Sequence, residues 1–183
     1  MADINSSAKD SAAKPAPGEE TASAADAAKA PTWDIIELLF FAYRDFVGDP
    51  DAVLANFAFG RAHHRVLHFV NRNPGMKVAD LLDILNITKQ SLGRVLKQLV
   101  DQGYVVQKEG ANDRRQRLLY ATPKGEALAM KLAGLQTERI ARALAELDPG
   151  ARDAACRFLM AMIDAEDRDG VQKLIARADQ TRT

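Results

Sequence analysis

The pattern of apolar and polar residues between positions 78 and 102 predicts two short helices joined by a tight turn. In each helix the apolar residues recur every three or four positions, which places them along one side. They are Val78, Leu81, Leu82 and Leu85 in the first helix, and Leu92, Val95, Leu96, Leu99 and Val100 in the second. Asn86 ends the first helix, and Thr88 can cap the second by accepting a backbone N–H from its first turn. The apolar sides can pack together, which leaves the other side of the second helix free.

The free side of the second helix, residues 88–102, carries side chains that can reach base edges in duplex DNA. Lys, Gln, Ser and Arg read bases in the major groove, and in a helix-turn-helix the N-terminal part of the second helix makes that approach. The candidate contacts are Thr88, Lys89, Gln90, Ser91, Arg94 and Lys97. Lys and Arg are also ordinary surface residues of helices. Taken alone, this helix therefore supports DNA contact and plain solvated surface about equally.

A β-hairpin with a basic tip is predicted directly after the second helix. Gly103 stands where a left-handed residue ends a helix, and Tyr104–Lys108 and Leu118–Ala121 are short runs of β-forming residues. The nine residues between these runs, 109–117, are too polar for a strand and too few for a domain. We refer to residues 109–117 as the wing tip.

The wing tip carries three arginines that suit the minor groove of DNA: Arg114, Arg115 and Arg117. Arginine in a narrow minor groove gains from the enhanced negative potential there. Asp113 lies beside them and is repelled by phosphate, so we expect its carboxylate to hold an arginine in place through a bidentate pair. Together with this tip, the helix over residues 88–102 is much better explained as a DNA-reading helix than as ordinary surface.

The order of these elements resembles the MarR family of winged-helix transcription regulators. The most specific features are Asn112-Asp113-Arg114-Arg115 in the wing tip and, after a strand, Thr122-Pro123-Lys124-Gly125 at the start of a long helix. The resemblance covers roughly residues 33–169, and the segment Phe59–Asn73 further resembles the PetP-like branch of that family.

The resemblance implies a mainly α fold with a small β-wing, in which N- and C-terminal dimerisation helices flank a winged helix-turn-helix. It also implies a homodimer on a near-palindromic DNA operator, with helix 88–102 in the major groove and the wing tip in the minor groove. A small-molecule effector is possible and unidentified. Neither an enzymatic activity nor a cofactor is expected, because no nucleophile–base pair, phosphate-binding glycine loop or metalloenzyme motif is present.

Residues 33–47 are predicted to form a helix whose apolar residues cover more than half of its circumference. They are Ile35, Ile36, Leu38, Leu39, Phe40, Phe41, Phe46 and Val47. Such a helix needs two partners, and a second subunit can be one of them. Its aromatic residues, with Tyr43, could instead line an effector pocket, as the resemblance allows. Core and dimer packing is the simpler account.

Turn residues set the limits of the other predicted helices. Gly48–Asp51 predicts a break or kink, after which a helix continues over Val53–Phe59 and another covers Arg61–Asn71. Residues 73–76 form a turn, and the residues after it can add a short strand to the hairpin.

Two more helices are predicted after the hairpin. Thr122 can cap the first, with Pro123 at its first position, and this helix runs to about Leu147. The last helix extends from Gly150 to about residue 167, and Gly170 interrupts it. These helices have little domain to pack on, so pairing with a partner subunit is the natural outcome.

Composition divides the chain into a tail and one folded domain. Residues 1–31 contain almost no large apolar side chain and are expected to be disordered. Residues 32–169 form the winged-helix domain, with a DNA-reading part over 60–122 and dimerisation helices over 32–58 and 123–169. Residues 170–183 are a short helix or frayed tail. No signal peptide or membrane span is indicated, so we expect a cytoplasmic protein.

The 183-residue chain has no net charge, but its basic residues are concentrated in one segment. The whole chain has 25 basic and 25 acidic residues, which taken alone argues weakly against nucleic-acid binding. Residues 74–125, however, hold nine basic and five acidic residues, so the positive charge gathers on the segment whose shape suggests DNA.

Two alternative functions use the same residues. The basic surface could bind an acidic protein partner, and a steep salt dependence on DNA would separate this interaction module from a DNA reader. His63, His64 and His68 could bind a metal in a small enzyme, but no nearby Cys, Asp or Glu completes a site, which favours packing or hydrogen bonding. The lone Cys156 resembles a redox-sensing thiol but lacks an adjacent activating base, so we expect a buried structural cysteine.

Overall fold

The computed structural model describes residues 31–110, 113 and 115–180 in two units, one ending at Leu38 and the other beginning at Leu39. The described residues form seven helices and three strands, which confirms the mainly α fold with a small β-wing. In chain order they are α2 (Trp33–Ala55), α3 (Arg61–Arg72), β1 (Met76–Lys77), α4 (Val78–Leu85), α5 (Lys89–Asp101), β2 (Val105–Glu109), β3 (Arg117–Ala121), α6 (Pro123–Ala145), α7 (Ala151–Ala161) and α8 (Arg168–Gln180). Residues 1–30 of the predicted disordered tail, and Arg114, lie outside the described residues.

The two helices of the helix-turn-helix begin and end where their cap residues predict. Helix α4 stops at Asn86, whose φ of 47° lies in the left-handed region that this residue type tolerates. Thr88 then caps α5, since its hydroxyl oxygen accepts a hydrogen bond from the backbone N–H of Ser91 at 3.2 Å. Gly103 ends the segment with a φ of 72°, as predicted.

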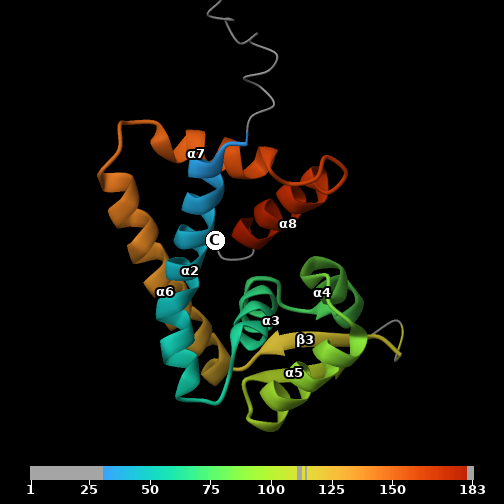
Figure 1. Cartoon of the computed structure of the whole chain (residues 1–183). Coiled ribbons are helices and arrows are strands. Elements are labelled where there is room, and N and C mark those ends of the chain that lie inside the picture. Colours follow the sequence, from blue (N-terminus) through green and yellow to red (C-terminus); the bar gives the residue numbers. More distant parts are fainter. Residues whose placement is uncertain (1–30, 111–112, 114, 181–183) are drawn as a thin grey trace, which may run out of the picture. The chain divides into compact units, whose positions relative to one another are not determined.

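The three strands form one antiparallel sheet in the order β1-β3-β2, with Met76 opposite Leu119 and Val105 opposite Ala121. The predicted hairpin is therefore confirmed. The short strand β1 adds to β3, on the side away from β2. Figure 1 shows α3, α4, α5 and β3 gathered together.

One hydrophobic core joins these elements. Its fully buried side chains come from α2, α3, α4, α5, the sheet and α6: Leu54, Leu67, Leu81, Leu92, Leu99, Leu119 and Leu132. Helix α6 begins against this core because Thr122 caps it and donates its hydroxyl to the carbonyl of Gly103 at 2.7 Å. Gly125 lies so close to the residue before β2 that any Cβ there would overlap the carbonyl oxygen of Tyr104.

The structure corrects two predictions about the first helix. Of the break or kink predicted at Gly48–Asp51, the break is absent, since α2 continues through Pro50 to Ala55. Proline removes one helical N–H, but its ring is fully buried here, and this burial offsets the lost hydrogen bond. The helix predicted over Val53–Phe59 therefore ends early, in a turn where Ala58 has a φ of 54°.

The end of the chain also differs from the prediction. Helix α7 stops at Ala161 rather than near residue 167, and Gly170 lies inside α8 instead of interrupting a helix. The Arg168 guanidinium donates to the carbonyls of Ala161 and Ile163 at 2.6 and 2.8 Å, which satisfies carbonyls at the end of α7. Gly170 stands in the first turn of α8, where backbone N–H groups lack helical partners in any sequence.

Cys156 is exposed on α7, so the prediction of a buried cysteine is wrong for the single chain. Among the described helices, none is both long enough and apolar enough to cross a membrane.

Candidate nucleic-acid interface

Helix α5 presents the predicted contact residues on its exposed side. Its other side is fixed in the core by four leucines and valines: Leu92, Val95, Leu96 and Leu99. Lys89, Gln90, Arg94 and Lys97 are exposed, and Lys97 forms an ion pair with Asp101 one turn later at 2.6 Å. Such an exposed pair adds little stability, so the Lys97 ammonium is available to a stronger anion.

Two of the six predicted contact residues, the cap Thr88 and Ser91 in α5, have hydroxyls that bond at the start of the helix. Thr88 accepts the N–H of Ser91 and donates its own hydroxyl proton to Ser91 Oγ at 2.9 Å. The Ser91 hydroxyl therefore keeps its own proton for an outside acceptor. Thr88 thus caps the helix, and its predicted contact with DNA stays a prediction.

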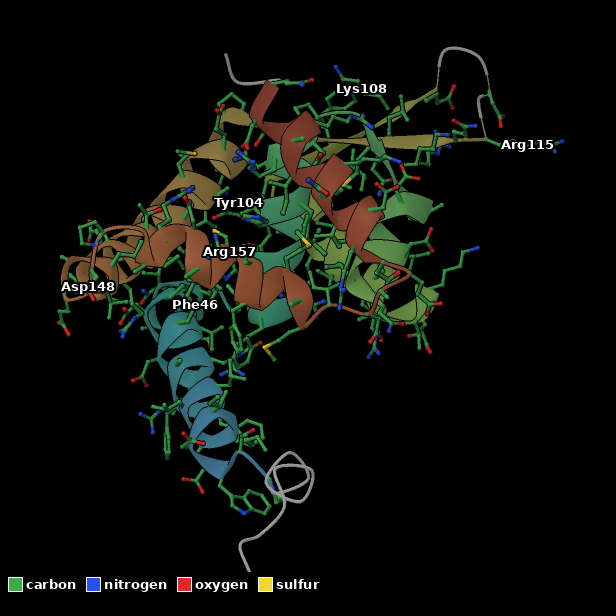
Figure 2. All side chains as sticks on the ribbon, turned by 90° about the horizontal axis from the view of Figure 1, so that it is seen from above. Phe46, Tyr104, Lys108, Arg115, Asp148 and Arg157 are labelled. Carbon is green, nitrogen blue, oxygen red and sulfur yellow. The ribbon has the colours of Figure 1, made fainter. Side chains whose placement is uncertain are left out.

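The wing tip places Arg115 at the far end of the hairpin, where the side chain points away from the helices (Figure 2). Among the described residues, the Asp113 carboxylate bonds to a backbone N–H and not to an arginine side chain. Asp113 Oδ1 accepts the backbone N–H of Arg115 at 2.9 Å, and the Asp113 carbonyl accepts the N–H of Gln116 at 3.0 Å. The carboxylate thus shapes the turn, as an aspartate does when it bonds to a backbone N–H two residues on. A pair with Arg114 falls outside the described residues.

Arg117 has a partner that the sequence analysis did not assign. Its guanidinium pairs with Glu109 across the hairpin at 3.1 Å, and the two residues stand opposite each other at the ends of β3 and β2. Both side chains are half-exposed or more. Opposite charges at facing strand positions stabilise a hairpin, so this pair holds the base of the wing tip.

A groove of about 1050 Å³ separates α5 from the hairpin, with the start of α4 along its edge. Its floor is apolar and its rim is mostly basic. Leu82, Leu92, Leu96 and Val100 contribute to the floor, and Lys77, Lys89, Lys97, Arg115 and Arg117 supply the positive charges. Asp80 and Asp101 are the acidic residues that line it. The groove thus connects the exposed side of α5 with the wing tip.

His63 links helix α3 to helix α5 through a hydrogen bond. Its Nδ1 accepts the backbone N–H of Gly60 at 3.1 Å, which leaves the ring proton on Nε2, and Nε2 donates to Gln98 Oε1 at 2.6 Å. The ring also stacks on Phe59, with centroids 4.6 Å apart. Sequence reasoning missed this contact because its partners lie 35 residues apart and no local pattern joins them.

A second cavity, of about 480 Å³, lies between α2, α3 and α6. Aromatic and polar side chains line it, among them Tyr43, Phe46, His64, Arg65, Phe69 and Gln136. His64 is 9% exposed. Its burial lowers the pKa of the imidazole, which the charge of Asp51 partly opposes. Among the described residues, no three His, Cys, Asp or Glu side chains gather as a metal site would require.

Three comparisons relate this geometry to known proteins. The model of the MarR family matches residues 59–116, from the start of α3 to the wing tip. The HTH-type transcriptional regulator PetP of Rhodobacter capsulatus is 44% identical over 139 residues, which are 76% of this chain and 84% of PetP.

Two solved structures share the fold at lower identity. FabT of Streptococcus pneumoniae in complex with DNA has a TM-score of 0.64 and 14% identity, over 72% of this chain and 94% of that chain. The Mycobacterium tuberculosis MarR family protein Rv2887 in complex with p-aminosalicylic acid has a TM-score of 0.52 and 23% identity, over 73% of this chain and 98% of that chain.

The MarR family and PetP are transcription regulators and not enzymes. The match to PetP extends well beyond the helix-turn-helix and covers most of both proteins. The exposed recognition helix, the hairpin beside it and the extent of this similarity show that the chain belongs to the MarR family of DNA-binding transcription regulators.

Proposed function

We propose that the chain acts in the cytoplasm as a homodimer on a near-palindromic operator, with α5 in the major groove and the wing tip in the adjacent minor groove. The groove between α5 and the hairpin carries this proposal, because five basic side chains surround it. In duplex DNA one sugar–phosphate strand separates the major groove from the minor groove. A helix and a wing that enter neighbouring grooves must hold that strand between them.

The side chains divide into base contacts and phosphate contacts. Gln90 and Arg94 project from the exposed side of α5 and can form paired hydrogen bonds to base edges, Arg to guanine and Gln to adenine. Lys77, Lys89 and Lys97 line the groove, where they suit phosphates. Arg115 at the wing tip suits the minor groove.

The homodimer is supported by large apolar side chains that are exposed to solvent on the helices flanking the DNA-reading part. The exposed large apolar residues on or beside α2, α6 and α7 include Phe40, Phe41, Ile140, Leu147, Phe158, Leu159 and Met162. Monomeric proteins rarely expose large apolar patches, so we infer that a second subunit covers these side chains. A two-fold dimer would place its recognition helices about 34 Å apart, in successive major grooves.

We further propose that the cavity between α2, α3 and α6 binds an aromatic carboxylate as an effector. It offers Tyr43, Phe46 and Phe69 for ring contacts, and Rv2887, which is similar in fold, was solved with p-aminosalicylic acid. Arg65, on the cavity wall, donates to the carbonyl of Leu85 at the end of α4 at 3.0 Å. A ligand carboxylate that attracts Arg65 would weaken this tie to the helix-turn-helix and so alter DNA binding.

The test of the DNA proposal starts from a pool of random duplexes, from which the protein selects its operator. Arg94→Ala should lower the preference for operator over unrelated DNA. Arg115→Ala should weaken operator binding by about 1–3 kcal/mol and remove preference at the flanking base pairs. Lys131→Ala removes an exposed charge from α6 and serves as the matched control. Equal operator affinity for wild type and both arginine variants would overturn the proposed interface.

The same titrations separate DNA reading from binding of an acidic protein. A DNA reader loses affinity steeply with salt and prefers one sequence, since it releases counterions and reads base edges. Weak binding without sequence preference would favour the protein-interaction alternative. The effector site is tested by titrating the protein–operator complex with salicylate and measuring the release of operator. The cavity variant Arg65→Gln is titrated in the same way.

A further inference from the structure

Gly93 is an unexpected residue at the fifth position of the 13-residue helix α5. Glycine weakens a helix interior because its backbone loses more conformational freedom than that of any other residue. The recognition helix must hold its side chains in fixed positions to read DNA. A weakening residue there calls for a physical reason.

The protein itself supplies no such reason. Apart from its two chain neighbours and the backbone of its own helix, a Cβ added at Gly93 would meet no heavy atom of the described residues within 4 Å, and the backbone does not have the positive φ that favours glycine. Gly125 shows the opposite case, since a Cβ there would overlap the Tyr104 carbonyl. Packing inside the chain therefore requires glycine at position 125 and leaves position 93 unconstrained.

The position of Gly93 indicates what requires it. The residue is exposed and lines the groove between α5 and the hairpin. Lys89 and Lys97, one helical turn before and after, line the same groove. These two lysines lie about 12 Å apart along the helix axis. Gly93 thus forms a notch in the helix surface, midway between two cations.

We propose that Gly93 is a positioning residue at which the sugar–phosphate strand of the operator packs directly on the backbone of α5, while Lys89 and Lys97 hold phosphates on either side. This inference rests on the proposed DNA interface and adds a steric requirement to it. Without a side chain at position 93, the strand can approach the helix closely enough for Gln90 and Arg94 to reach base edges. A side chain in the notch would hold the strand away.

The proposal predicts that stability and DNA affinity change in opposite directions. Gly93→Ala should raise the thermal midpoint by about 2–4 °C, because alanine favours the helix and the added methyl has open space. The same methyl should lower operator affinity about five- to hundredfold, as overpacking of a close contact does. Gly93→Leu should lower it further, and neither variant should change the salt slope, since no charge is lost.

Gly134→Ala is the matched control. Gly134 lies inside α6, and a Cβ there also meets nothing within 4 Å in the described chain. This variant should gain stability by a similar amount and bind operator as the wild type does. The measurements are thermal unfolding and titration of labelled operator at several salt concentrations.

The outcomes separate this inference from the proposed function. If Gly93→Ala is stabilised and binds operator as tightly as the wild type, the notch has no role and the inference is overturned, while DNA reading stands. If the wild type selects no DNA sequence, the proposed function fails and the inference fails with it. A loss of affinity that grows from alanine to leucine, at constant salt slope, supports the close approach.

Discussion

The helix-turn-helix with its hairpin and the helices that flank it use apolar residues in different ways. In the first region, α4 and α5 bury their apolar residues inside the same chain, with Leu81 and Leu99 fully enclosed. None of the residues of α7, all of which the structure describes, is buried. The first region completes its core with one chain, whereas the second has an apolar surface that one chain leaves in water.

This difference matches the partners that we propose for the two surfaces. The groove beside α5 has a basic rim, and such a surface binds phosphates. The open face of α7 carries Phe158 and Leu159, and such a surface binds another apolar surface. We therefore propose that one chain uses different elements to bind DNA and to bind a second subunit.

The largest expected effect is on the core of the DNA-reading region. Leu99→Ala removes a fully buried side chain from α5 and should lower the free energy of unfolding by about 2–5 kcal/mol, since the lost contacts leave a cavity. Leu159→Ala, at a residue that is 56% exposed, should change it little when measured in dilute monomer. Urea unfolding followed by circular dichroism measures both. Similar losses for the two variants would remove the contrast between the regions.

The next effect concerns the partner surface of α7. Leu159→Glu puts a charge on a residue that is exposed in one chain but buried in the proposed dimer. Replacing this apolar contact by a charge should raise the dimer dissociation constant by about 30-fold or more, which corresponds to about 2 kcal/mol. Light scattering across a dilution series gives this constant.

Arg157→Glu is the control for this charge, because it lies on another side of the same helix. It should dimerise like the wild type. A dimer that tolerates Leu159→Glu would show that the two subunits meet elsewhere, and a wild type that stays monomeric at every concentration would remove the dimer itself.

A smaller effect is expected at the start of the recognition helix. Thr88→Ala removes the oxygen that accepts the N–H of Ser91, which should cost about 1 kcal/mol of stability. Thr88→Ser keeps this oxygen and should retain most of the stability. Urea midpoints of the two variants measure the difference. Equal midpoints would mean that α5 is held by its packing and not by its cap.

The sequence predicted the DNA-reading region closely because its signals are local. The apolar stripes of α4 and α5, the cap at Thr88 and the left-handed Gly103 each involve residues within one or two turns of one another. The structure confirmed these elements to within about one residue. It also placed the candidate base contacts on the exposed side of α5, although their roles remain predictions.

The features that the sequence analysis missed depend on distant residues. Helix α2 passes through Pro50 because the ring is buried in a core built from later segments. His63 contacts Gln98, and Arg65 contacts the carbonyl of Leu85, across 35 and 20 residues of sequence. No periodicity within one helix reports such contacts. The partner of Asp113 could not be predicted for a different reason. Both an arginine side chain and a backbone N–H lie within one or two residues of it, and the sequence does not show which of them the carboxylate bonds to.

The smallest expected effect concerns His64. This titrating residue lines the cavity between α2, α3 and α6. Its burial between α2, α3 and α6 lowers the pKa of the imidazole below the usual value of about 6.5, so the folded chain favours the neutral ring. As the pH falls through about 6.5, the unfolded chain takes up the proton first, and stability is lost until the folded imidazole also titrates. Above this range the contribution is complete and independent of pH.

His64→Phe removes the titrating group and keeps an aromatic ring in the cavity. The stability of this variant should therefore fall less than that of the wild type between about pH 7 and pH 5, while the carboxylates contribute equally to both and cancel in the difference. Urea midpoints at several pH values give the two curves. Parallel curves would mean that the folded chain accepts the proton on His64 as readily as the unfolded chain does.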